Sequence, residues 1–119
     1  MNYMNYVLAA LGIGFLVLKF VRSRTVKKQM KQLIENKSKY FLLDVRTPGE
    51  FASVSVPGSV NIPLAELPSR MKELAGKENI IVYCQSGMRA GQAKSILQNN
   101  GHKDVINAGS WQSVANTVG

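Results

Sequence analysis

The chain of 119 residues contains one cysteine, Cys84, and one histidine, His102. A single cysteine excludes a disulfide within the chain, and no group of cysteines and histidines has the spacing of a zinc site. A cysteine protease needs a histidine beside its thiol, and His102 stands in a Gly-His-Lys turn that suits this role poorly. Repeats and low-complexity stretches are also lacking. One domain is therefore expected beyond the N-terminal segment.

Acidic residues are scarce, with seven against fifteen lysines and arginines, which gives a formal net charge of +8. The excess is concentrated between residues 19 and 39, where eight basic residues face a single glutamate. Residues 40–119 are nearly neutral. A basic segment directly after a hydrophobic run favours a membrane surface over nucleic acid as the partner. We therefore expect no nucleic-acid partner.

One long hydrophobic run covers residues 3–21 and holds no charge before Lys19. A helix of about 20 residues crosses a bilayer, so we predict a transmembrane anchor at residues 1–22. A cleaved secretory signal is the alternative, but it needs basic residues before the run and a small-residue cleavage site after it. The basic residues after the run predict a single-pass protein with the N-terminus outside and the catalytic domain in the cytoplasm.

Residues 23–38 are predicted to form a basic amphipathic linker helix. Val26, Met30, Leu33 and Ile34 recur at the spacing of one helix face. This face could lie on anionic lipid or pack on the domain that follows, and the sequence leaves both alternatives open.

Short apolar runs alternate with helical patterns over residues 39–119. Strands are expected at 40–45, 60–62, 80–83 and 104–107, and helices at 48–53, 63–76 and 88–100. Such alternation predicts an α/β fold in which helices flank both faces of a parallel sheet.

The segment 80–89 is the most informative part of the chain. An apolar strand ends at Cys84, a polar loop follows, and a helix begins near Met88. The free N–H groups and the dipole of that helix favour an anion, and with it the thiolate, which is the reactive form of cysteine. Asp44 and Asn107 end two further strands at the same edge of the sheet. The pattern indicates nucleophilic chemistry on an anionic group, or its storage.

Four segments in order resemble a single-domain rhodanese, the thiosulfate sulfurtransferase family, and in particular its phage shock protein E type. They are residues 44–51, 56–64, 84–89 and 107–111. The resemblance implies a rhodanese-like α/β fold over residues 39–119, here preceded by the predicted anchor.

The resemblance also implies a site. Cys84 would carry a sulfane sulfur as a persulfide, and the residues after it would form the anion-binding cradle, namely Gln85, Ser86, Gly87, Met88 and Arg89. The thiolate would take sulfur from thiosulfate or a persulfide and pass it to cyanide or a thiol. No metal and no organic cofactor is required for this chemistry.

Asp44 and Arg46 are expected to support the site rather than to react. Asp44 at a strand end could orient the loop, and Arg46 could pair with Glu50.

Two other functions compete with sulfur transfer. A cysteine-dependent phosphatase or arsenate reductase places five residues between cysteine and arginine, whereas four stand between Cys84 and Arg89. A membrane-tethered persulfide carrier or docking module without turnover is compatible with all of these features.

Overall fold

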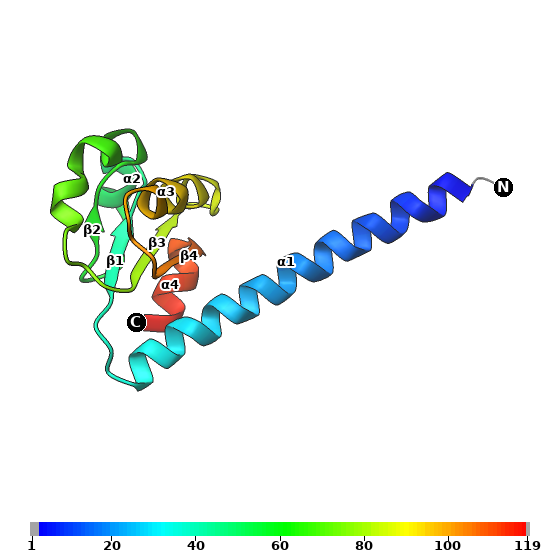
Figure 1. Cartoon of the computed structure of the whole chain (residues 1–119), viewed down its shortest axis with the longest axis horizontal. Helices are drawn as coiled ribbons and strands as arrows, with labels where there is room; N and C mark the ends of the chain where they lie inside the picture. The colour runs from blue at the N-terminus through cyan, green and yellow to red at the C-terminus, as the bar shows by residue number, and fades with distance from the viewer. Residues whose placement is uncertain (1–2, 119) are drawn as a thin grey trace.

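The computed structural model describes the backbone of residues 3–118, together with the side chains of residues 24–118 and of a few earlier positions. Four parallel strands form one sheet in the order β2-β1-β3-β4. The strands are β1 (Phe41–Asp44), β2 (Val60–Asn61), β3 (Ile80–Cys84) and β4 (Val105–Ser110). The helices are α1 (Tyr3–Glu35), α2 (Pro48–Ser53), the 3-10 helix η1 (Leu64–Leu74), α3 (Met88–Asn99) and α4 (Trp111–Val118) (Figure 1). The predicted α/β fold with a parallel sheet is confirmed.

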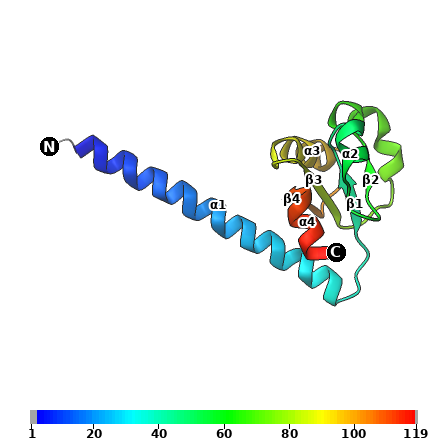
Figure 2. The same ribbon diagram turned by 180° about the vertical axis from the view of Figure 1, so that it is seen from behind.

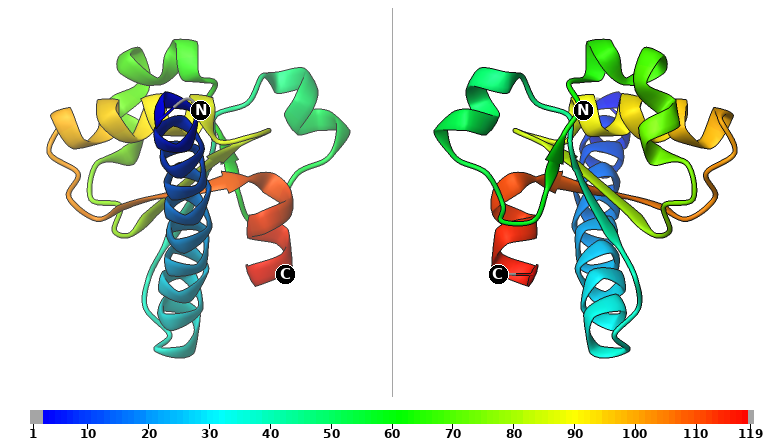
Figure 3. Two further views of the ribbon diagram at one scale, coloured as in Figure 1. Left: turned by 90° about the vertical axis from the view of Figure 1, so that its right-hand side faces the viewer. Right: turned by 90° about the vertical axis from the view of Figure 1, so that its left-hand side faces the viewer.

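The central strand β3 is buried along its whole length, which explains its continuous apolar sequence. Successive side chains of a strand point to opposite faces of the sheet. Val82 and Cys84 pack in a core with α3 and η1, whereas Ile81 and Tyr83 pack in a second core with α1 and α4. Figure 3 shows the sheet between these two groups of helices. Cys84 therefore belongs to the face that α3 covers.

The first helix, α1, runs without interruption from Tyr3 to Glu35. Its C-terminal part packs on the domain, since Met30 is fully buried and Val26 and Leu33 contact the same core. Of the two alternatives that the sequence left open for residues 23–38, the structure thus shows packing on the domain. Figure 2 shows the N-terminal part of α1 projecting away from the sheet.

Within residues 3–118, no helix is both long enough and apolar enough to cross a membrane. The predicted transmembrane anchor at residues 1–22 is therefore not supported. Nor does the helix end near residue 22, because α1 continues through the basic segment that follows. Residues 1 and 2 lie outside the described residues. The orientation and the cytoplasmic location, which were inferred from the anchor, stay predictions.

Two elements differ from their predicted form. The helix expected at 63–76 is a 3-10 helix that contains Pro68 and a non-helical Arg70. Proline lacks the N–H group that a regular α-helix needs at this position. The last strand continues beyond the predicted residue 107 to Ser110, through an irregularity in its pairing with β3.

The packing of α1 can be tested at Met30. Truncation to alanine leaves a cavity, so we expect Met30→Ala to lower the free energy of unfolding by about 2–4 kcal/mol in urea denaturation. Its neighbour Lys31 is exposed, and Lys31→Ala serves as the matched control with little expected effect. Equal stabilities for the two variants would show that α1 is not part of the folded unit.

Candidate functional site

The carboxyl ends of three strands meet at one edge of the sheet. Asp44 pairs with Tyr83, and Cys84 pairs with Ser110. Cys84 ends β3, and a short loop leads from it directly into α3. Asp44 and Cys84 are therefore strand ends at one end of the sheet, as predicted, whereas β4 continues past Asn107, which pairs with Val82, and ends at Ser110.

The Cys84 thiol lies under the loop that follows it. The residue is 1% exposed, and the N–H group of Gly87 donates a hydrogen bond of 2.9 Å to its sulfur. Gly87 is also the N-cap of the 12-residue helix α3, so the sulfur faces the positive end of the helix dipole. A negative sulfur at this position is stabilised by a donor that the backbone already holds in place.

Two glycines allow the loop to take this shape. Gly87 has φ of 105°, and Gly109 in β4 has φ of 79°, a left-handed conformation that favours glycine. A Cβ atom on Gly87 would lie 3.3 Å from the Cα of Gly109. A side chain at Gly87 would therefore be strained by the left-handed backbone and crowded by the backbone of Gly109.

Asn107 joins the loop to the last strand. Its Nδ2 donates to the carbonyl oxygen of Gly87 over 3.3 Å, and its Oδ1 accepts from the N–H of Gly109 over 2.9 Å. Sequence reasoning placed Asn107 at this edge but assigned no function to its side chain. An amide that follows apolar residues at the end of a strand is the signal that could have indicated one.

The only cation of the predicted cradle is already paired. Arg89 donates from Nη1 and Nη2 to the two carboxylate oxygens of Glu50, over 2.7 and 3.0 Å. The pKa of Glu50 is lowered to about 2. The bond from Arg89 is the largest cause, and the hydrogen bond from the backbone N–H of Thr47 is the second. The bond to Glu50 also raises the pKa of Arg89, to which the charge of Cys84 makes a smaller contribution. The predicted pairing of Arg46 with Glu50 is wrong, because Arg89 occupies that carboxylate.

Arg46 is instead buried against Asp44. Its Nε and Nη2 lie 3.0 and 2.8 Å from Oδ2 of Asp44, and Nη2 also donates to the carbonyl of Val54. The central carbon of the guanidinium lies over the ring of Trp111, 5.8 Å from the ring centre. Each charge would be costly to bury alone, so the pair fixes the end of β1 and the segment that carries Glu50. The supporting role that was expected of both residues at the site stays a prediction.

The remaining cradle residues border the opening of the site. Gln85 and Ser86 are exposed, and the side chain of Met88 is 78% exposed. The loop therefore directs the Gly87 N–H to the sulfur and leaves the side chains of Gln85, Ser86 and Met88 exposed to the solvent.

Comparison with known proteins gives a consistent picture. The family model described as a rhodanese-like domain matches residues 26–117. A sulfurtransferase of Allochromatium vinosum is 31% identical over 67% of this chain and 75% of its own length. The thiosulfate sulfurtransferase PspE of Escherichia coli is 39% identical over 61% of this chain and 72% of its own length. A solved structure, a rhodanese with anions from E. coli, superposes with a TM-score of 0.58 at 37% identity, covering 64% of this chain and 92% of that one.

The left-handed position at Gly87 yields a first prediction for the site. Gly87→Ala adds a Cβ in a strained conformation, which costs about 1–3 kcal/mol or displaces the loop from the sulfur. We expect lower stability and a loss of any Cys84-dependent turnover. Gly91→Ala, one turn further along α3, is the matched control because its Cβ meets only Asn107 Nδ2 at an ordinary 3.5 Å. Equal turnover in both variants would contradict the proposed loop geometry.

The Glu50–Arg89 pair yields a dependence on pH. The pKa of Glu50 falls from 4.5 to about 2 on folding, so the stabilisation is present above pH 4.5 and is lost as the pH falls toward 2. We therefore expect wild type to exceed Glu50→Gln in free energy of unfolding at neutral pH, with the difference shrinking across this window. A difference that stays constant from neutral pH to pH 2 would refute the pairing.

Proposed function

Because the chain belongs to the rhodanese-like domain family, we propose that it moves a sulfane sulfur from thiosulfate or a persulfide to a thiophilic acceptor through a persulfide on Cys84. The relatives that are named sulfurtransferases support sulfur transfer as the general activity. The single observation that carries the proposal is the 2.9 Å hydrogen bond from the Gly87 N–H to the Cys84 sulfur at the start of α3.

In the first step, the Cys84 thiolate attacks the outer sulfur of the donor. A bond forms between Sγ and that sulfur, and the bond from that sulfur to the rest of the donor breaks. The leaving group is sulfite when the donor is thiosulfate, and a thiolate when the donor is a persulfide. The product is an anionic persulfide on Cys84, which backbone N–H groups of the loop stabilise in the same way as an oxyanion hole.

In the second step, the acceptor attacks the outer sulfur of the Cys84 persulfide. The new bond converts cyanide to thiocyanate, or converts a thiolate to a new persulfide. The bond between the outer sulfur and Sγ breaks, and Cys84 is released as its thiolate. No electrons are gained or lost overall, so the cycle requires no redox partner. Two successive displacements at one cysteine predict ping-pong kinetics.

The charge around the loop bears on the choice of donor. Glu50 already compensates the charge of Arg89, so the cradle offers mostly backbone N–H groups to an incoming anion. Such a site suits a singly charged persulfide better than the dianion thiosulfate. We therefore propose that a persulfide is the better donor and that thiosulfate serves with a higher KM.

A persulfide carrier without turnover is the second candidate. It is supported by the burial of Cys84, which limits how readily a free acceptor reaches the sulfur. The phosphatase alternative gains no support, because Glu50 holds both terminal nitrogens of Arg89 that a phosphate would need.

Cyanolysis separates these functions. Protein supplied with thiosulfate or a persulfide and then cyanide should release thiocyanate catalytically, whereas Cys84→Ser should lose essentially all of this activity, at least about a thousandfold. His102→Ala is the control variant and should retain wild-type turnover. One added sulfur on Cys84 by intact-mass measurement, without turnover, would favour the carrier. Turnover that persists in Cys84→Ser would refute the persulfide mechanism.

A further inference from the structure

The last strand, β4, lies at one edge of the sheet. Among residues 3–118 it pairs with β3 on one side. The N–H of Ile80 donates to the carbonyl of Asp104 over 3.0 Å. In a parallel pair, every second residue of a strand directs both its N–H and its C=O to the neighbouring strand, so this bond shows which residues of β4 face β3. In that alternation Ile106 faces β3, and the backbone N–H and C=O groups of Val105 and Asn107 point away from it. The edge thus presents groups on which a further strand could pair.

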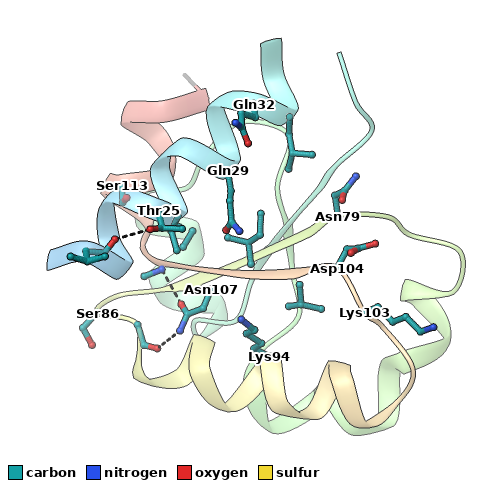
Figure 4. A pocket seen from close by; sticks show the side chains of 18 of the residues that line it. Thr25, Gln29, Gln32, Asn79, Ser86, Lys94, Lys103, Asp104, Asn107 and Ser113 are labelled. Carbon is teal, nitrogen blue, oxygen red and sulfur yellow. Dashed lines mark hydrogen bonds between the residues drawn. The ribbon is translucent and has the colours of Figure 1, made fainter. Parts of the chain in front are cut away.

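A groove of about 1110 Å³ follows this edge. Figure 4 shows β4 crossing it, with Thr25, Gln29 and Gln32 of α1 on one side and Lys94 of α3 on the other. The two helices pack on opposite faces of the sheet, and residues of both line the groove beside β4. An added strand would therefore lie between two helices, as the inner strands of the sheet do.

One end of the groove is the Cys84 loop. Ser86, Gly87 and Met88 line the groove together with the residues of β4. A strand paired at Val105 and Asn107 that continues in the same direction would pass Gly109, and its end would reach this loop because the backbone of Gly87 lies close to that of Gly109. The exposed side chain of Met88 offers an adaptable apolar contact at that end.

The charges favour one kind of occupant. Lys94 and Lys103 line the groove, against Asp104 as its acidic residue. The whole chain carries +8, so a second copy would bring further positive charge to a basic groove. An acidic segment of another protein has the complementary charge, and the glutamine and asparagine side chains along α1 can bond to its backbone.

We propose that this groove binds an extended acidic segment of a protein sulfur acceptor, which adds to β4 as a fifth parallel strand. The inference rests on the proposed function of Cys84. In a parallel arrangement, the segment runs in the same direction as β4. Its C-terminal end therefore lies at the carboxyl end of the sheet, where Cys84 ends β3. A thiol near that end loses its proton to solvent, and its sulfur attacks the outer sulfur of the persulfide. The bond from that sulfur to Sγ breaks, and Cys84 leaves as its thiolate.

The test uses a short synthetic peptide of alternating glutamate and valine that ends in cysteine, with the full-length protein. Hydrogen exchange by NMR should show new protection of the Val105 and Asn107 amides on peptide addition, whereas Ile106, already bonded to β3, should change little. A peptide N-methylated at one set of alternating amides should lose this protection, and a peptide methylated at the other set should keep it. Absence of protection at Val105 and Asn107, or indifference to both methylated sets, would overturn the proposal.

A charge reversal provides the second readout. Lys94→Glu should weaken peptide binding about three- to tenfold. Lys72 is an exposed residue of η1 and does not line the groove, so Lys72→Glu should bind the peptide like wild type. Both variants should keep wild-type thiocyanate release. Thiocyanate release without peptide protection overturns the groove alone. Peptide protection without sulfur transfer to cyanide or to the peptide thiol overturns the proposed function and the acceptor role that depends on it.

Discussion

The hydrogen bond from the Gly87 N–H to the Cys84 sulfur is the interaction on which the rest of the site depends. It forms because Gly87 adopts a left-handed conformation and its backbone passes close to Gly109. Asn107 holds the two strand-end segments together. Behind them, the parallel pairing of β3 with β4 and the packing of α3 on the sheet keep the sulfur under the start of the helix. The fold thus positions one backbone donor on one sulfur atom.

The charged residues near the site act mainly on one another. Asp44 and Arg46 form a buried pair that fixes the end of β1, and Glu50 and Arg89 form a second pair between α2 and α3. Both pairs are neutral overall. In the proposed function, the attraction for an anion at Cys84 comes chiefly from the Gly87 N–H and the helix dipole, which do not require a cationic side chain. This distribution of charge is the basis for our proposal that a singly charged persulfide is the better donor.

Much of the fold could be predicted from the sequence, because hydrophobic period and turn residues act locally. The apolar run before Cys84 is a buried strand, and Thr47, Pro48 and Glu50 do form the predicted capping box at the start of α2. Contacts between distant residues could not be predicted in the same way. Glu50 was available to either Arg46 or Arg89, and only the folded chain, which brings the first turn of α3 within hydrogen-bond distance of Glu50, decides between them. The side-chain bonds of Asn107 also join residues 20 positions apart, beside a shift in the pairing of β3 with β4 that no local pattern indicates.

The N-terminal helix shows that a local pattern can also predict the wrong element. A hydrophobic run followed by basic residues predicted an anchor and a separate linker, whereas α1 is continuous and its C-terminal part belongs to the core through Met30. The same helix forms one wall of the groove beside β4. The most direct measurement of the central claim is the NMR signal of the Gly87 amide before and after sulfur loading. We expect a large shift on loading that cyanide reverses, and an unchanged signal on a protein whose mass shows one added sulfur would contradict the account.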